Sequence, residues 1–343
     1  MKHDTVLGLT LAAMIATAGA TSAQAQSVSI GLPSAHGFYG VPLYVAEKLG
    51  YFGDLSVEYM IFSGGSDVAR QVANGSADIG FAQPTEILLN AMAKTGDTLP
   101  VSYWYMTEPY SSNQIAVPVD SPIQSLADIR GKVVGISTLT ASNVAQFRIV
   151  LQRAGMDPDI DVIWRTVGLG AEHLMALKTG TIDISATNNM RHASYEFEGV
   201  PLRVISLDDT AAQFGNGFFS HNDTLQDDAA KANYAVIAKG FAQATDYCSA
   251  NATHCVEILF EKFPELLSGE RTDEENIAFG VSQLQARLSS LKLREDQNGV
   301  PGFFPESVWI AAIDFLGSVE EMPADLDTTT IYTNEIALAA SNQ

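Results

Sequence analysis

The chain carries one short segment twice, and this duplication restricts its possible folds more than any other feature. Residues 64–82 read GGSDVARQVANGSADIGFA, and residues 168–187 read GLGAEHLMALKTGTIDISAT. Alignment of the two copies pairs two glycines and an Asp-Ile dipeptide: Gly65 with Gly170, Gly75 with Gly180, and Asp78-Ile79 with Asp183-Ile184. A glycine at the second of these positions is typical of the left-handed residue that ends a helix. Each copy is therefore expected to contain a helix, a turn and a buried strand.

The duplication extends beyond these segments. In the first copy we predict strands over 28–33, 57–62 and 77–82, with helices over 41–49 and 66–73. In the second copy we predict strands over 132–137, 161–167 and 182–187, with a helix marked by Val144, Phe147 and Leu151 and another over 171–178. Each copy thus has the order β-α-β-α-β, which favours a parallel sheet covered on both faces. The fold class is α/β, with two doubly wound lobes and a ligand cleft at the carboxyl ends of their strands.

Two segments are expected to cross between the lobes and act as a hinge. Residues 111–131 read as a strand leaving the first lobe, a turn and a short helix, and residues 203–223 return with Gly215 and Gly217. The chain beyond about residue 227 is mainly helical and is expected to wrap the first lobe. We therefore divide the chain into 26–118 for the first part of lobe 1, 119–215 for lobe 2, and 216–343 for the completion of lobe 1 and the C-terminal helices.

Residues 1–25 have the pattern of a secretory signal peptide. Lys2 precedes an apolar run from Val6 to Ala18, and Ala23-Gln24-Ala25 supplies small residues for cleavage, so the mature chain is expected to begin near Gln26. The alternative of a membrane anchor is disfavoured because the run is too short to span a bilayer. No cysteine follows the run, so we predict export without a lipid anchor and without direct membrane insertion.

The charge and the two cysteines limit the partners and the compartment. The formal net charge of −21 argues against nucleic acid and anionic lipid as partners. Cys248 and Cys255 are expected to pair in a structural disulfide between two helices, because an oxidising compartment favours pairing. Their spacing does not match a metal site, and His254 is expected at the surface. We predict neither a metal nor a cofactor.

Three motifs together resemble a known family. HGFYGVPLYVAEKLGYF, the first copy GGSDVARQVANGSADIGFA, and SPIQSLADIRGKVVGIS occur in the order found in NMT1/THI5-like periplasmic substrate-binding proteins of ABC importers, and the resemblance covers about residues 28–220. That group includes binders of sulfonates, nitrate, thiamine-precursor pyrimidines and aromatic acids. The resemblance implies a type II periplasmic-binding fold, a location in the periplasm, and an ABC permease in the inner membrane as partner. We expect a monomer that closes on its ligand.

Enzyme signatures are missing from the sequence. It contains no G-x-S-x-G, H-E-x-x-H or G-x-x-x-x-G-K-[ST] motif. Eukaryotic relatives that make the thiamine pyrimidine carry a cysteine-rich motif, whereas both cysteines of this chain lie far downstream. We therefore predict a binding protein and not an enzyme. The alternatives are a ligand-sensing subunit for a membrane receptor and, less favoured, a pyrimidine-synthase-like enzyme on the same fold.

Lobe 1 supplies the first set of predicted ligand contacts, at the ends of its strands. We expect hydrogen bonding or stacking from the first loop, free N–H groups at the start of a helix, short polar side chains after the third strand, and one stacking aromatic on the fourth. Strict alternation would put Tyr103 and Tyr105 on one face of that fourth strand and Trp104 on the other. The predicted residues are His36, Phe38, Tyr39, Ser63, Gly64, Gly65, Gln83, Thr85, and either Trp104 or Tyr105.

Lobe 2 supplies the second set. Hydroxyl side chains at the start of a helix can bind a carboxylate, sulfonate or carbonyl, although serine and threonine at this position also serve simply as helix caps. Two amides and an arginine follow the last repeated strand, where the arginine could clamp an anion. The predicted residues are Ser137, Thr138, Thr140, Asn188, Asn189 and Arg191. Together with the aromatics, they favour a planar organic ligand that is neutral or singly charged.

Overall fold

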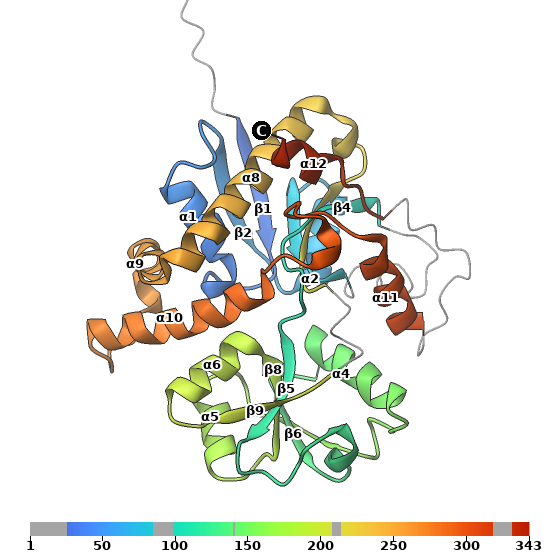
Figure 1. Cartoon of the computed structure of the whole chain (residues 1–343), viewed down its shortest axis with the longest axis vertical. Helices are drawn as coiled ribbons and strands as arrows, with labels where there is room; N and C mark the ends of the chain where they lie inside the picture. The colour runs from blue at the N-terminus through green and yellow to red at the C-terminus, as the bar shows by residue number, and fades with distance from the viewer. Residues whose placement is uncertain (1–25, 85–98, 140, 208–213, 318–330, 343) are drawn as a thin grey trace, which may run out of the picture.

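The computed structural model describes residues 26–84, 99–139, 141–207, 214–317 and 331–342, and within them two lobes are each built on a five-stranded sheet (Figure 1). The predicted signal peptide lies outside the described residues. Within the described ranges, no helix combines the length and apolar character needed to cross a bilayer.

Lobe 1 is assembled from both ends of the chain. Its sheet has the order β2-β1-β3-β10-β4, made of Ser56–Ile61, Ser27–Leu32, Ile79–Ala82, Gly217–His221 and Val101–Met106. The helices from the N-terminal half are η1 (Phe38–Gly40), α1 (Val41–Lys48) and α2 (Gly65–Ala73). The C-terminal part adds η3 (Thr224–Gln226), α8 (Asp228–Ala250), α9 (Ala252–Lys262), η4 (Pro264–Leu266), α10 (Asp273–Ser290), η5 (Glu295–Gln297), α11 (Glu306–Gly317) and α12 (Glu335–Ser341). The expectation that the tail wraps the first lobe is confirmed, since α8, α9 and α12 pack on it.

Lobe 2 is continuous in sequence. Its sheet has the order β7-β6-β8-β5-β9, made of Ile163–Thr166, Val133–Ile136, Ile184–Asn188, Asn113–Pro118 and Leu202–Ile205. The helices around it are η2 (Leu126–Ile129), α4 (Ser142–Arg153), α5 (Ala171–Lys178) and α6 (Asn189–Phe197). The predicted α/β class with two lobes is confirmed.

The two sheets have the same plan. In each, the strands of the repeated unit run parallel in the order second-first-third, as β2-β1-β3 and β7-β6-β8. The fourth position is taken by an antiparallel strand that arrives from the other lobe, β10 in lobe 1 and β5 in lobe 2. The sheets are therefore mixed and not purely parallel. The strand Asn113–Pro118, which we assigned to lobe 1, belongs to the lobe 2 sheet, so the first crossing precedes it.

The repeated Asp-Ile pair has the same structural task in both copies. Asp78 accepts a hydrogen bond from the Ser29 amide at 2.8 Å, and Asp183 accepts one from the Val133 amide at 2.8 Å. Each aspartate directly precedes the third strand of its unit, and its carboxylate links that strand to the first strand. The paired glycines also correspond, because Gly75 (φ 78°) and Gly180 (φ 66°) both adopt the left-handed conformation that follows a helix. The repeated residues therefore have equivalent structural roles in the two units.

Removing one of these carboxylates should weaken its lobe. We expect Asp183→Asn to lower the free energy of unfolding by about 1–2 kcal/mol, because a charge-assisted hydrogen bond to a strand amide is replaced by a weaker one. Equilibrium unfolding in urea measures this change. Asp120→Asn, at an exposed turn, is the matched control and should change the free energy by less than about 0.5 kcal/mol. Equal effects of the two substitutions would contradict this role for Asp183.

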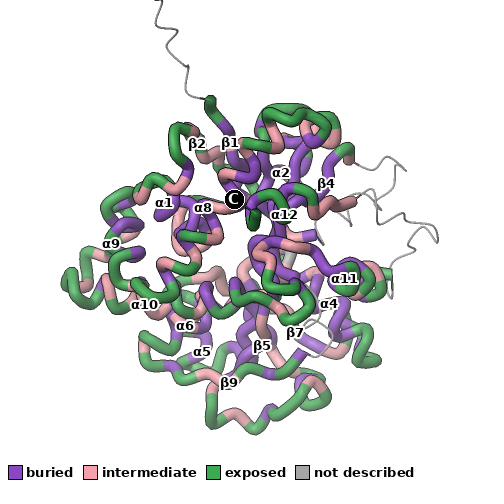
Figure 2. The backbone as a smooth tube through the Cα atoms, turned by 45° about the horizontal axis from the view of Figure 1, so that its top comes forward, coloured by how far each residue is buried: buried purple, intermediate pink, exposed green. Residues whose placement is uncertain are grey.

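Contacts between the lobes occur on two sides. On one side α6 packs along α10, with an ion pair between Glu198 and Arg271 and an edge-to-face contact between Phe197 and Phe279. On the other side the Arg153 guanidinium lies 3.1 Å from the Asp314 carboxylate, which joins α4 to α11. One of the two large apolar clusters includes residues of both lobes, and Figure 2 shows buried segments in each lobe. The lobes are therefore packed against each other.

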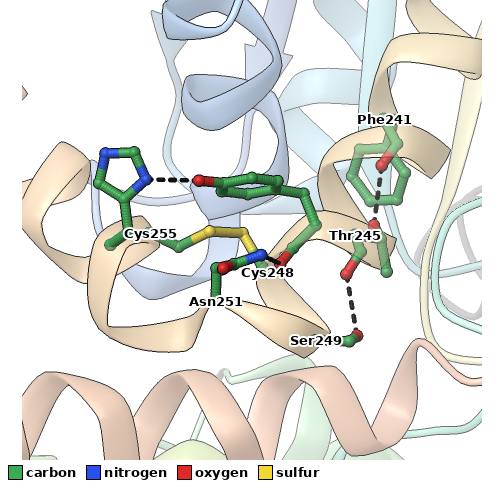
Figure 3. The surroundings of a disulfide bond; sticks show 8 residues. Phe241, Thr245, Cys248, Ser249, Asn251 and Cys255 are labelled. Carbon is green, nitrogen blue, oxygen red and sulfur yellow. Dashed lines mark hydrogen bonds between the residues drawn. A yellow bond between two sulfur atoms is a disulfide. The ribbon is translucent and has the colours of Figure 1, made fainter.

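A disulfide joins α8 to α9. Cys248 and Cys255 are bonded across the short turn at Asn251, and both are fully buried (Figure 3). His254 is exposed, and its Nδ1 lies 2.6 Å from the Tyr247 hydroxyl. The arrangement is the one expected of a structural cross-link between two helices that cover lobe 1.

Candidate functional site

The carboxyl ends of the strands from both lobes meet at the junction between the sheets. In lobe 1, register places Ala82, Gly217 and Met106 side by side, so Gln83, Asn216 and Thr107 form a row at that edge. In lobe 2, Asn113 is paired with Asn188 at the end of β8. The Asn113 amide donates to the Gln83 side chain at 3.5 Å and to the Gln146 side chain at 2.6 Å. The two rows are therefore in contact.

The two crossing segments run beside each other at this point. The Glu108 amide donates to the Asn216 carbonyl at 3.0 Å, and the Gly215 amide donates to the Glu108 carbonyl at 2.7 Å. Gly215 leaves no room for a side chain, because an added Cβ would lie 2.5 Å from the Glu108 side chain. The chain thus passes from lobe 1 to lobe 2 and back through one narrow, hydrogen-bonded strip.

A polar layer, which we call the junction cluster, fills this region. Its members come from the strand ends, both crossings, α4, α6 and α10, and all but half-buried Gln83 are buried: Gln83, Thr107, Glu108, Asn113, Gln146, Asn189, Asn216 and Arg287. Buried polar side chains are uncommon without partners. So many of them between two lobes distinguish this region from the apolar cores on either side.

An ion pair lies at the centre of the junction cluster. Arg287 Nη1 lies 2.5 Å from Glu108 Oε2, and both side chains have no solvent exposure. The Asn216 amide donates to the same carboxylate oxygen. The Arg287 guanidinium also lies over the Tyr39 ring, 4.8 Å from its centroid. The pair therefore connects the first crossing, the second crossing, α10 and the first loop of lobe 1.

Several atoms of the junction cluster have no hydrogen-bond partner among the described residues. They are Thr107 Oγ1, Glu108 Oε1, Asn189 Oδ1, Asn216 Oδ1, and Nε and Nη2 of Arg287. A buried polar atom left without a partner costs about 1–3 kcal/mol. A binding site for a polar ligand would present such unpartnered donors and acceptors.

Three of the predicted ligand contacts lie at the junction. Tyr39 lies under Arg287 and stacks on Phe81 with centroids 4.5 Å apart. Gln83 contacts Asn113. Asn189 is buried, and its amide nitrogen donates to the Ala286 carbonyl at 2.7 Å and to the Ser290 hydroxyl at 2.8 Å on α10.

The other residues that we predicted as ligand contacts in lobe 2 are not members of the junction cluster. Asn188 acts as a cap, since its side chain accepts from the Arg191 amide at 3.0 Å. Ser137 is half-buried, whereas Thr138 and Arg191 are exposed. Thr85 and Thr140 lie outside the described residues. The structure therefore brings only part of the predicted set to the junction.

The first-loop residues His36 and Phe38 pack within lobe 1. His36 stacks on Phe263 at 4.3 Å, and its Nδ1 lies 2.8 Å from the Tyr44 hydroxyl. Burial lowers the pKa of His36, with Lys262 adding to the effect. Phe38 contacts Phe260 edge to face, at 6.1 Å between centroids. Both were predicted as ligand contacts, and in the structure their side chains attach the loop to α1 and α9.

The backbone N–H groups at the start of α2 are not all free to bind an anion. The Ser63 amide donates to Asp67 at 3.3 Å, and the Gly64 amide donates to the Pro33 carbonyl at 3.0 Å. The hydrogen bond from Ser63 is the largest cause of the lowered pKa of Asp67. Ser63, Gly64 and Gly65 were expected to offer N–H groups to a ligand. The helix instead supplies its own carboxylate, and two of these N–H groups are already used.

The fourth strand departs from simple alternation. Phe218 pairs with Tyr105 while Phe219 pairs with Tyr103, so Trp104 is an extra residue in a β-bulge. Trp104 and Tyr105 consequently join the same apolar cluster, and Tyr103 joins the other. Trp104 is fully buried, stacks on Tyr234 at 5.1 Å and donates to the Ser220 hydroxyl. We predicted Trp104 or Tyr105 as the stacking partner of the ligand; in the structure both rings are buried in the apolar core of lobe 1, and Tyr105 also borders a small pocket beside Phe241 and Leu291.

Sequence reasoning missed most of the junction cluster. Thr107 and Glu108 follow the fourth strand, which is a signal that could have been used. Asn216 lies between two glycines on the returning segment. Arg287 lies on a helix of the tail, and nothing in the surrounding LQARLSS marks it as a junction residue. Its place is set by how α10 packs, which local sequence does not encode.

Lobe 2 also contains a buried histidine pair beside the junction. His173 and His192 both contact the Ser185 hydroxyl through Nε2, at 2.8 and 3.0 Å. Burial lowers the pKa of His192 to about 3, and His173 adds to this decrease. Burial also lowers the pKa of His173. Ser185 is fully buried on β8, so this group is a closed hydrogen-bond network within the lobe.

Comparison with known proteins gives a family match and several structures of the same fold. A family model described as NMT1/THI5 like matches residues 38–250. A protein of known structure from Bordetella bronchiseptica is 20% identical, with a TM-score of 0.67 over 92% of this chain and 97% of its own. The aliphatic sulphonate binding protein of Escherichia coli is 16% identical (TM-score 0.64, 90% and 92% covered). The alkanesulfonate-binding protein of Xanthomonas axonopodis is 15% identical (TM-score 0.62, 91% and 100% covered). No curated protein matches the chain.

Proposed function

Because the chain belongs to the NMT1/THI5-like family, we propose that it is a solute receptor of the periplasm. In this role it binds a small organic molecule between its lobes and delivers it to an ABC permease. The observation that carries the proposal is the junction cluster, where buried donors and acceptors without partners lie between two sheets and beside both crossing segments. Ligand sites of open α/β sheets occupy this position, outside the carboxyl ends of the strands.

Binding is expected to proceed by closure of the lobes. The contacts of α6 with α10 and of α4 with α11 join one lobe to the other, so they are available to stabilise a closed form. A ligand that contacts both lobes favours that form by its differential affinity and needs no chemical step. The best placed candidate for a nucleophile, Ser185 between two histidines, has no exposure to solvent, which supports a binding role over a catalytic one.

Thermal unfolding tests the proposal. A ligand that binds only the folded protein stabilises it by about 2.7 kcal/mol at one hundred times its dissociation constant. We expect at least one member of a panel of aromatic acids, pyrimidines, aromatic amides and sulfonates to raise the Tm in a concentration-dependent way. Asn189→Leu, which removes an unpartnered acceptor at the junction, should reduce that shift, while the exposed control Arg191→Met should retain it. A Tm that no compound in the panel moves would count against the proposed function.

A further inference from the structure

The junction cluster is balanced in charge. It holds one carboxylate and one guanidinium, on Glu108 and Arg287, and its other members are amides and a hydroxyl. The two charges lie in contact, so each already compensates the other. A guest that carries a net charge would therefore bring an uncompensated charge into a region closed to solvent, which is unfavourable.

The unpartnered atoms require both donors and acceptors from a guest. Glu108 Oε1, Asn189 Oδ1 and Asn216 Oδ1 are acceptors, whereas Arg287 offers Nε and Nη2 as donors. A bare carboxylate or sulfonate would satisfy the free edge of the guanidinium. It would also leave the three oxygens without donors and add a second negative charge beside Glu108. A guest with N–H groups next to an acceptor atom satisfies both sets.

Two neighbouring helix starts, those of α2 and α6, have part of their backbone donors occupied. At α2, the Ser63 and Gly64 amides are bonded to Asp67 and Pro33. At α6, the Asn189 amide donates to the Ser112 carbonyl at 2.8 Å, and Asn188 caps the Arg191 amide. At both places, part of the backbone donors that usually hold an oxyanion is therefore already used.

We infer that the ligand is a net-neutral molecule that presents N–H donors and an acceptor atom on one edge, as in a carboxamide or an amino-substituted heteroaromatic ring. Glu108, Asn189 and Asn216 accept its N–H groups, and Arg287 donates to its acceptor. This inference rests on the proposed function and deepens it, because it separates neutral ligands from the free oxyanions that the same fold could carry.

Calorimetric titration of matched probes tests the inference. Benzamide and benzoate have nearly the same shape and differ in charge and in N–H groups, and 4-aminopyrimidine and benzenesulfonate extend the comparison. We expect the neutral member to bind at least tenfold more tightly than the anion in each comparison. Tighter binding of benzoate or benzenesulfonate than of the neutral probes would overturn the inference and leave the proposed function standing. If no probe binds and the protein takes up no small molecule from a metabolite extract, both fail.

The substitution Glu108→Gln should shift the preference from benzamide towards benzoate. Glu108→Gln leaves Arg287 without its counter-ion, so this variant should gain at least tenfold in affinity for benzoate relative to benzamide. In the double variant Glu108→Gln/Arg287→Gln the cluster is again neutral, and benzamide should again be favoured. An unchanged ratio in a folded Glu108→Gln variant would overturn the inference. If that variant does not fold, the wild-type ratio and the double variant decide.

Discussion

Replacing Arg287 by methionine should lower the free energy of unfolding by about 3–5 kcal/mol, because the substitution leaves the Glu108 carboxylate buried without a counter-charge. The Asn216 amide donates to this carboxylate but carries no charge. The Tyr39 ring would also lose the guanidinium that lies over it. Equilibrium unfolding in guanidinium chloride, followed by far-UV circular dichroism, measures the change.

Two further variants separate the ion pair from other effects. The double variant Glu108→Gln/Arg287→Met should recover most of the lost stability, because no lone charge remains in the protein interior. Arg191→Met removes an exposed arginine and should change the free energy of unfolding by less than about 0.5 kcal/mol. A loss below about 1 kcal/mol in Arg287→Met would mean that the ion pair does not hold the junction together.

Acidification should destabilise the protein through His192. Its pKa is about 3 in the folded state and 6.5 without the fold, because burial opposes protonation. Below pH 6.5 the unfolded chain therefore binds a proton that the folded chain does not. The free energy of unfolding then decreases by about 1.4 kcal/mol for each pH unit. Between pH 7 and pH 4.5 the stability lost in this way amounts to about 2–3 kcal/mol, and it is recovered when the pH returns above 6.5.

Comparison with His192→Gln isolates this contribution. The variant replaces the imidazole by a neutral amide, so its stability should fall less than that of the wild type over the same pH range. Urea unfolding at pH 7.0 and pH 4.5 for both proteins gives the difference directly. His254→Gln, at an exposed histidine, should behave like the wild type. Equal losses in wild type and His192→Gln would contradict the assigned role of burial.

The architecture was predictable because the duplication is a local pattern repeated in one chain. Helix, glycine turn and Asp-Ile strand recur with the same spacing, and the structure explains why, since Asp78 and Asp183 each close their unit in the same way. The lobe to which strand β5 belongs was predicted wrongly. Its sequence shows that it is a strand, whereas its sheet depends on where the chain crosses, which the sequence of the strand does not specify.

The candidate site was predictable only in part. Tyr39, Gln83 and Asn189 follow strands of the repeated unit, so their place at the junction follows from topology. For Trp104 and Tyr105 we assumed strict alternation, whereas a single extra residue in the bulge changes which side of the sheet a side chain faces. The central ion pair was missed because Glu108 and Arg287 are far apart in sequence and meet only when α10 packs along the junction between the lobes.

Native mass spectrometry of the purified protein tests the central claim most directly. After incubation with a low-molecular-weight metabolite extract, the wild-type chain should retain one small organic molecule per chain, released when the protein is unfolded. Asn189→Leu should lose it, and Arg191→Met should keep it. Wild-type chains that stay free of any small molecule, or equal retention by Asn189→Leu, would contradict a ligand site at the junction of the lobes.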